Sequence, residues 1–286
     1  ITRSVMKLFT FPNNPRANKA LIAAEYAGVS IDVVIVEMGK TNKTPEFLAL
    51  NPWGKVPTLE TDDGQGIWES NAIARYVARL SENTLFGNSP VQYGQVEQWI
   101  DWVRGDLELA ASVWLYPIYG VIPNNPLATE RAQQDIKKYM SVLNGYLESR
   151  EYLVGDSVTL ADIVVACTLV PLYTKVFDVD YRSSFESVTK WFLNIVNQPN
   201  FKKVQNEVTL CENMEVAGAA RAVPVANTEE KSPSSVASAE SEAVENNEAV
   251  ENNEAIENKE APVENNEVVE NKDAPVENNA DGENVG

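Results

Sequence analysis

The sequence has 286 residues, of which 44% are hydrophobic, and a formal net charge of −19. A chain of this length predicts about two domains. The sequence contains no histidine, which excludes His-based general acid–base catalysis, Ser-His-Asp and Cys-His nucleophile pairs and histidine metal sites, so no metal site is expected. Apolar runs such as residues 163–170 fall short of the ~20 residues of a membrane span, so no membrane insertion is expected.

The two cysteines, Cys167 and Cys211, are too few and too far apart in the sequence for a disulfide framework. They are expected to be reduced and mostly buried. Residues 1–30 have no apolar stretch typical of a signal peptide. Together these features predict a cytoplasmic protein.

Strand and helix signals alternate through the first 80 residues. Residues 5–11 form an apolar strand pattern, and residues 15–27 predict a helix that ends at Gly28. The β-branched run 31–36 predicts a buried strand. Residues 45–50 predict a short helix. Residues 56–60 and 66–68 predict a hairpin that turns at Asp62-Asp63-Gly64, and residues 70–80 predict a further helix. The order predicts a thioredoxin-like domain at residues 1–83.

From residue 91 onward only helical patterns are found. Apolar residues recur at helical spacing in two stretches: Val96, Trp99, Ile100, Val103, Leu107 and Trp114, then Ala132, Ile136, Tyr139, Met140, Leu143 and Leu147. Residues 160–173 are apolar nearly all round and predict a central buried helix, and residues 191–196 predict another. The expected fold class is therefore α/β plus all-α, with an all-helical domain at residues 88–215.

The end of the sequence has a different composition. Residues 221–286 hold 17 of the 42 acidic residues and 4 of the 23 basic ones, so they carry −13 of the net charge. A degenerate Glu-Asn repeat starts at Glu245 and contains no aromatic residue, so it offers too little apolar surface to pack into a core. Residues 218–286 are therefore expected to form a disordered acidic tail. This charge disfavours direct binding of nucleic acid.

The motif Thr159-Leu160-Ala161-Asp162 predicts a capping box at the start of the central helix. The Thr159 hydroxyl would accept from the Asp162 N–H, and the Asp162 carboxylate would accept from the Thr159 N–H. The box should contribute about 1–2 kcal/mol. It resembles a folding signature of the glutathione transferase superfamily, and its expected role is structural.

Two further segments resemble the glutathione site of that superfamily: Asn51-Pro52-Trp53-Gly54-Lys55-Val56-Pro57 and Glu69-Ser70-Asn71-Ala72-Ile73. The resemblance implies a cis Pro57, with the Val56 backbone facing the cysteinyl part of glutathione. It implies that Glu69 and Ser70, at a helix N-terminus, bind the γ-glutamyl group. Lys43 and Lys55 complete this weak or vestigial site. Alternatively, Pro57 only shapes the fold and Ser70 only caps a helix.

The group that activates the glutathione thiol in transferases, a Tyr, Ser or Cys after the first strand, is missing from the corresponding segment. The Tyr-type position falls near Thr10 or Phe11 and the Ser-type position near Asn14. Asn14 could donate a hydrogen bond to a thiolate, whereas Thr10 could point the wrong way. No catalytic residue is therefore assigned, and Asn14 and Thr10 are the candidates if the protein is active.

Over residues 5–215 the sequence also resembles a narrower family, the gamma subunits of eukaryotic translation elongation factor 1B. The similar segments include Thr41-Asn42-Lys43-Thr44-Pro45-Glu46-Phe47-Leu48, Tyr152-Leu153-Val154-Gly155 and Asn197-Gln198-Pro199-Asn200-Phe201. The resemblance implies a non-catalytic scaffold that docks the exchange-factor (alpha/beta) subunit and indirectly assists elongation factor 1A in delivering aminoacyl-tRNA. It requires no cofactor.

Two other readings of the sequence remain open. Val56, Pro57, Glu69 and Ser70 keep the tripeptide pattern, so an active glutathione transferase that conjugates glutathione to small electrophiles is the alternative. A transferase-like appendix of an aminoacyl-tRNA synthetase is a third reading, although no catalytic domain follows in the sequence. A homodimer is compatible with each of them.

Overall fold

The computed structural model describes residues 5–82 and 84–218, all of which lie in one compact unit. The structure describes the predicted domains at 1–83 and 88–215 except for residues 1–4 and 83. Apart from Gly218, the acidic tail expected at 218–286 lies outside the described residues. None of the described helices is long and apolar enough to cross a membrane.

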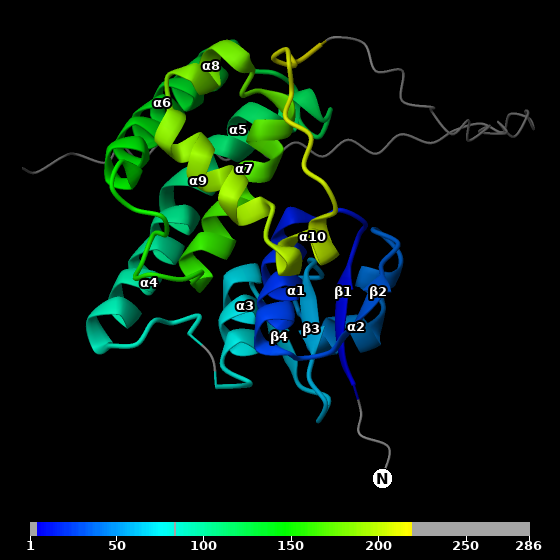
Figure 1. Cartoon of the computed structure of the whole chain (residues 1–286). Coiled ribbons are helices and arrows are strands. Elements are labelled where there is room, and N and C mark those ends of the chain that lie inside the picture. The colour runs from blue at the N-terminus through cyan, green and yellow to red at the C-terminus, as the bar shows by residue number, and fades with distance from the viewer. Residues whose placement is uncertain (1–4, 83, 219–286) are drawn as a thin grey trace, which may run out of the picture. The chain divides into compact units, whose positions relative to one another are not determined.

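A four-stranded mixed sheet organises the N-terminal part, as the sequence predicted (Figure 1). Its strands are β1 (Met6–Thr10), β2 (Ile31–Ile35), β3 (Thr58–Glu60) and β4 (Gly66–Trp68), in the order β2-β1-β3-β4. β1 pairs parallel with β2 and antiparallel with β3, and β3 pairs antiparallel with β4. The thioredoxin-like topology is confirmed.

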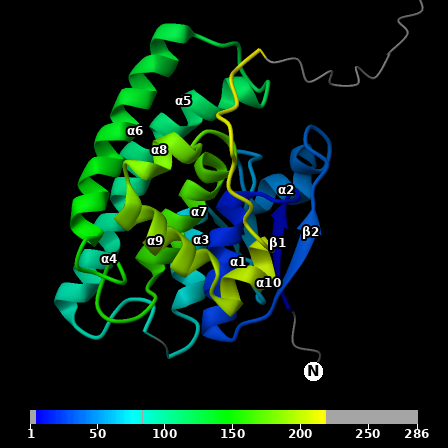
Figure 2. The ribbon, with the colours of Figure 1, turned by 45° about the horizontal axis from the view of Figure 1, so that its top comes forward.

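Helices cover both faces of the sheet (Figures 1 and 2). α1 (Pro15–Ala27) and α3 (Ser70–Ala78) pack against each other, and α2 (Pro45–Leu50) follows a short 3₁₀ turn. Successive β1 side chains point to opposite faces. Leu8 is fully buried in the main core, while the ring of Phe9 lies 5.6 Å from that of Phe47 in α2.

The prediction that β2 is a buried strand was wrong. Val33 and Ile35 are 48% and 58% exposed, and only Val36, just past the strand, is buried. The reason is topological, because β2 pairs only with β1 and so forms an edge of the sheet. A run of β-branched residues favours a strand but does not determine whether both of its faces are covered.

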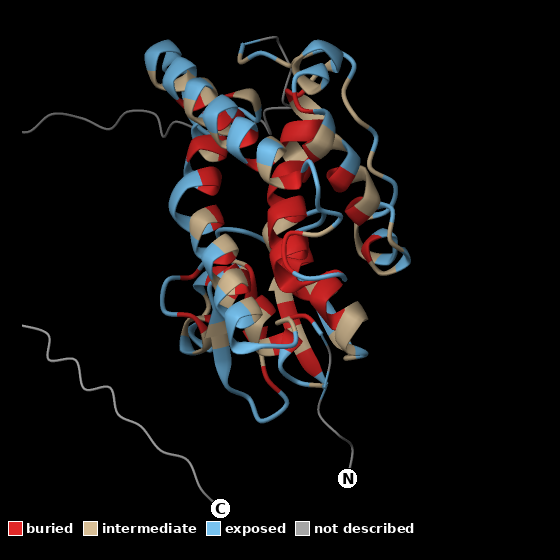
Figure 3. Cartoon of the chain, turned by 60° about the vertical axis from the view of Figure 1, so that its left-hand side comes forward, coloured by how far each residue is buried: buried red, intermediate tan, exposed pale blue. Residues whose placement is uncertain are grey.

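The C-terminal part is all-helical, as predicted, and its buried residues run through the middle of the unit (Figure 3). The helices are α4 (Pro90–Trp102), a π-helical turn (Val103–Leu107), α5 (Glu108–Ile118), α6 (Pro126–Leu147), α7 (Leu160–Lys175), α8 (Val179–Ser183), α9 (Glu186–Val196) and α10 (Pro199–Gln205). α7 is buried over most of its length, which confirms the central helix. Trp99 and Tyr139, expected on the core faces, are only partly buried.

The predicted capping box is present at the start of α7, and its carboxylate does more than cap the helix. Asp162 Oδ2 accepts hydrogen bonds from Thr159 N and Oγ1, at 2.9 and 2.8 Å. Oδ1 accepts from Leu153 N and from Trp191 Nε1 in α9, both at 2.9 Å. Burial raises the pKa of this fully buried carboxyl, and the four hydrogen bonds oppose that rise.

After α10 the chain continues as an extended segment along α7 and α8, drawn yellow in Figure 2. Cys211 N donates to Tyr173 O at 2.9 Å, and Glu215 N donates to Lys175 O at 2.8 Å. Both cysteines are free. Cys167 is fully buried, and burial raises its pKa to about 12, whereas Cys211 is partly exposed. The prediction of mostly buried thiols therefore holds fully only for Cys167.

Candidate functional site

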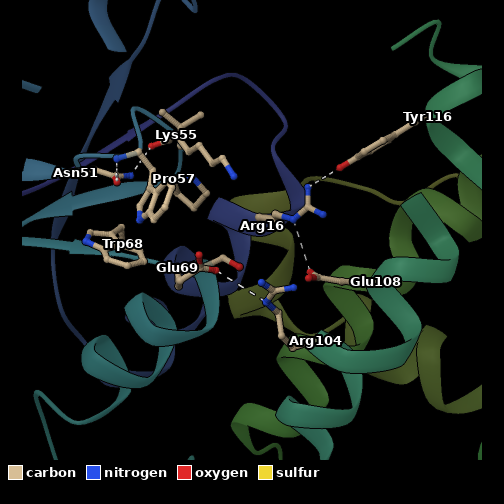
Figure 4. A pocket seen from close by; sticks show the side chains of 12 residues that line it. Arg16, Asn51, Lys55, Pro57, Trp68, Glu69, Arg104, Glu108 and Tyr116 are labelled. Atoms are coloured by element: carbon tan, nitrogen blue, oxygen red, sulfur yellow. Dashed lines mark hydrogen bonds and ion pairs between the residues drawn. The ribbon is translucent and has the colours of Figure 1, made fainter. Parts of the chain in front are cut away.

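A cavity of about 610 Å³ lies between the N-terminal sheet domain and the first helices of the C-terminal part. Five of the predicted site residues and their neighbours form one wall, and residues of α1, the π-helical turn and α5 form the other (Figure 4). The lining residues are Arg16, Asn51, Trp53, Lys55, Val56, Pro57, Trp68, Glu69, Ser70, Arg104, Glu108 and Tyr116.

The loop before β3 contributes most of the residues of the first wall. The Val56–Pro57 peptide bond is cis, as the resemblance implied. The buried Asn51 holds the loop, because its Nδ2 donates to Lys55 O and to Thr58 Oγ1, both at 2.9 Å. Gly54 has a φ of 60°, and a Cβ there would lie 2.8 Å from Asn42 O, so both the backbone conformation and the space favour glycine.

Glu69 and Ser70 stand at the N-terminus of α3, as predicted. Glu69 adopts a φ of 69°, which is uncommon for a residue with a side chain, while Ser70 is buried as the first residue of the helix. Glu69 Oε2 lies 3.9 Å from Arg104 Nε, and both side chains are more than half exposed, so this ion pair is weak. Free N–H groups of the helix and a carboxylate therefore face the same cavity.

The two candidate catalytic residues do not line the cavity, and their side chains are hydrogen-bonded to each other. Asn14 caps α1 with its Oδ1, which accepts from Arg16 N at 3.1 Å. Its Nδ2 donates to Thr10 Oγ1 at 3.1 Å, and both residues are buried. Lys43, also predicted for the site, is exposed and lies outside the lining, whereas Lys55 is part of it. The role of Asn14 and Thr10 in catalysis stays a prediction.

Sequence reasoning missed the charged groups on the second wall. Lys19 in α1 is fully buried, and its Nζ lies 2.6 Å from Glu108 Oε1 in α5 and 3.1 Å from Asn71 Oδ1 in α3. Arg16 Nε lies 3.8 Å from the same Glu108 oxygen, and Arg16 Nη1 donates to Tyr116 Oη at 3.0 Å. Arg16 and Lys19 on α1 are 89 or more positions from Glu108 and Tyr116 on α5, so only the fold brings the two pairs together.

The ionisation of this cluster follows from its charges. Burial acts to raise the pKa of Glu108, but the positive charges of Lys19 and Arg16 outweigh it and lower the pKa below its ordinary value. Burial lowers the pKa of Lys19 in spite of Glu108. Burial also opposes ionisation of Tyr116, yet hydrogen bonds with Ser112 and Arg16 lower its pKa. The cavity wall thus combines an arginine and a phenol with Glu108, which the buried Lys19 pairs from behind.

Comparison with known families agrees with this fold. The glutathione S-transferase N-terminal domain family matches residues 4–79, and the glutathione S-transferase C-terminal domain family matches residues 112–199. Together the two families match more than half of the chain. The chain therefore belongs to the glutathione S-transferase fold family.

Within that family the chain is similar to elongation factor 1-gamma. It is 45% identical to elongation factor 1-gamma of Homo sapiens over 211 residues. This alignment covers 72% of this chain and 48% of the human protein. It is 46% identical over 209 residues to elongation factor 1-gamma 1 of Oryza sativa subsp. japonica, which covers 72% of this chain and 50% of the rice protein. The chain spans about half the length of the curated relatives it matches.

Solved structures share the fold. The GST-like domain of elongation factor 1-gamma from Saccharomyces cerevisiae aligns with a TM-score of 0.64 at 20% identity, over 74% of this chain and 98% of that domain. A delta-class glutathione transferase from Nilaparvata lugens aligns with a TM-score of 0.61 at 25% identity, over 70% of this chain and 92% of that chain. The same fold thus serves a translation factor and an enzyme.

Proposed function

We propose that the chain is a non-catalytic scaffold subunit of the elongation factor 1B guanine-nucleotide-exchange complex in the cytoplasm. In this role it docks the exchange-factor subunit and assists elongation factor 1A indirectly in delivering aminoacyl-tRNA. The observation that carries the proposal is the 45% identity to elongation factor 1-gamma across the whole transferase-like part. An aminoacyl-tRNA synthetase and a second copy of the chain are further candidate partners.

The state of the activation segment supports a role without chemistry. Transferases need a donor beside the glutathione sulfur, because only the thiolate is a good nucleophile and a free thiol has a pKa near 8.5. Here the amide of Asn14 is used at both ends, by the Arg16 N–H and by Thr10, and Phe11 has no donor. A transferase fold that lacks the thiol-activating donor is better suited to binding a partner through its surface than to catalysis.

The proposal predicts that the transferase-like core alone binds the exchange-factor subunit. A chain ending at Gly218 should capture the purified N-terminal region of that subunit with an affinity within about threefold of the full chain. The reason is that residues 221–286 contain no aromatic anchor of the kind that usually dominates an interface. The measurement is a pull-down followed by titration calorimetry of both chains.

The salt dependence of this binding supplies the control. Docking through the folded surface should weaken only modestly between low and high salt, since the exposed charges that remain contribute little each. A full chain that binds while the shortened chain does not would show that the acidic segment is the docking element, contrary to the proposal.

A weak glutathione transferase is the second candidate function, favoured by the cavity that holds the cis Pro57, Glu69 and Ser70 together. We expect glutathione to bind weakly and to be conjugated to a general electrophile far more slowly than by a true transferase, because the candidate donors Asn14 and Thr10 are hydrogen-bonded to each other and do not line the cavity. The assay is conjugation of a chromogenic electrophile by the unmodified protein and by Ser70→Ala. A fast rate that Ser70→Ala abolishes would replace the scaffold proposal with the enzyme.

A further inference from the structure

The wall of the cavity that faces the cis proline is charged. Arg16, Arg104, Glu108 and Tyr116 stand there, and the described residues on that wall include no aliphatic side chain. A wall of this kind does not suit an apolar molecule. Such a molecule would shield the charged side chains from water without offering them hydrogen-bond partners. The chemistry of its ligand is therefore set by the charges.

The balance of charge in the cavity is positive. The charge of Glu108 is neutralised by the fully buried Lys19, whose Nζ lies 2.6 Å from Glu108 Oε1. Arg16 Nε lies 3.8 Å from the same oxygen, so the carboxylate compensates the charge of Arg16 only in part. Glu69 meets Arg104 only at 3.9 Å, with both side chains in contact with water. Lys55 adds a third cation to the lining. In Figure 4 the charged ends of these three side chains converge on the space between the two walls.

The guanidinium of Arg16 has donors to spare. Within the described part of the chain it makes one hydrogen bond, from Nη1 to Tyr116 Oη, out of the five N–H groups that an arginine offers. Its side chain is 39% exposed, and its backbone N–H in the first turn of α1 donates to the side chain of Asn14. The Tyr116 phenol, which accepts from Arg16 and also hydrogen-bonds with Ser112, places a hydroxyl group beside this guanidinium. Arginine and tyrosine hydroxyl in this arrangement suit an oxygen anion.

We propose that this wall is a binding site for a small oxyanion, a phosphate or carboxylate group, held by Arg16 and Tyr116 with Arg104 at its edge. The site lies across the cavity from Val56, Pro57 and Ser70, and it requires neither glutathione nor the partner subunit. Trp53 and Trp68, 64% and 38% exposed, stand in the same lining and provide a fluorescence signal of occupancy.

The test titrates the full chain with pyrophosphate, and separately with glutarate, at constant ionic strength. Saturable quenching of tryptophan fluorescence, confirmed by calorimetry, is expected. Arg16→Gln should weaken binding by about tenfold or more, since it removes a charge-assisted hydrogen bond. Tyr116→Phe, which keeps the ring, should weaken it by about threefold or more. Binding of pyrophosphate alone assigns the site to phosphate groups, and binding of both assigns it to oxyanions in general.

Matched variants separate a site from general electrostatics. Arg131→Gln removes an exposed arginine of α6 outside the cavity lining and should leave the affinity unchanged. Arg104→Gln changes a side chain that is 58% exposed, so it tests the site even if Arg16→Gln fails to fold. Absence of saturable binding, or equal losses in Arg131→Gln and Arg104→Gln, would overturn the proposal.

Discussion

Glu108→Leu should lower the free energy of unfolding by about 3–5 kcal/mol, because it leaves a buried ammonium without its carboxylate. Lys19 is fully buried, and its other described partner is the neutral Asn71 oxygen at 3.1 Å. An isolated charge in such a place has lost its hydration and gains nothing comparable from an amide. Chemical denaturation monitored by circular dichroism measures the change.

The double variant Lys19→Met with Glu108→Leu distinguishes the loss of pairing from the loss of packing. Replacing both members of a buried pair by apolar residues is often neutral or stabilising, so this protein should unfold within about 1 kcal/mol of the original. Glu60→Gln is the matched control, because Lys7 and Glu60 pair at 3.2 Å with partly exposed side chains. This substitution should change the free energy of unfolding by less than about 1 kcal/mol. A double variant as unstable as Glu108→Leu would contradict this explanation.

The same pair predicts a dependence on pH. The pKa of Glu108 is lower in the folded chain than its ordinary value; burial opposes this shift, but the charges of Lys19 and Arg16 outweigh it. A carboxyl of this kind stabilises the fold fully above its unfolded pKa of about 4.3. The contribution is lost as the pH falls through the lower folded pKa. The slope of stability against pH below about 4.3 should therefore be smaller in the double variant.

Asp162→Ala should lower the free energy of unfolding by about 4 kcal/mol, more than the loss of an ordinary helix cap. The substitution removes the acceptor of four hydrogen bonds at once and leaves Leu153 N, Thr159 N and Trp191 Nε1 buried without it. The effect should appear as a lower thermal midpoint.

Asp156→Ala is the matched control, because Asp156 is an exposed residue of the loop that leads to α7. It should leave the thermal midpoint unchanged. Affinity for the exchange-factor subunit, measured below the midpoint of Asp162→Ala, should also be retained, as the carboxylate is fully buried. A midpoint of Asp162→Ala equal to that of Asp156→Ala would show that the four hydrogen bonds contribute nothing.

Local signals made much of the fold predictable. The helices at 15–27 and 45–50 carry proline at the first turn and a side-chain cap, and their bounds match the sequence analysis. The capping box was likewise visible, since its two members are three residues apart. The remaining bonds of Asp162 were not, because Trp191 is 29 positions away and nothing in the sequence pairs them.

The candidate site divides in the same way. Its first wall comes from two contiguous segments, around Pro57 and Ser70, and could be predicted because a resemblance covers whole segments. Its second wall comes from α1, the π-helical turn and α5, and Lys19 and Glu108 are separated by 89 positions. Lys19 and Glu108 each lie in a helical stretch of the sequence and belong to none of its recognisable motifs. Only tertiary packing shows that they meet inside the protein.

The contact of α1 with α7 bears on how this chain could be divided. α1 packs on α7 as well as on α3, and one apolar core continues from the sheet domain into the helices. A chain severed at the exposed Glu82 would give two fragments that each present part of that core to water. Neither fragment would be stable alone, yet together they could re-form the core without a covalent link. We therefore expect the two family domains to act as complementary pieces of one folding unit.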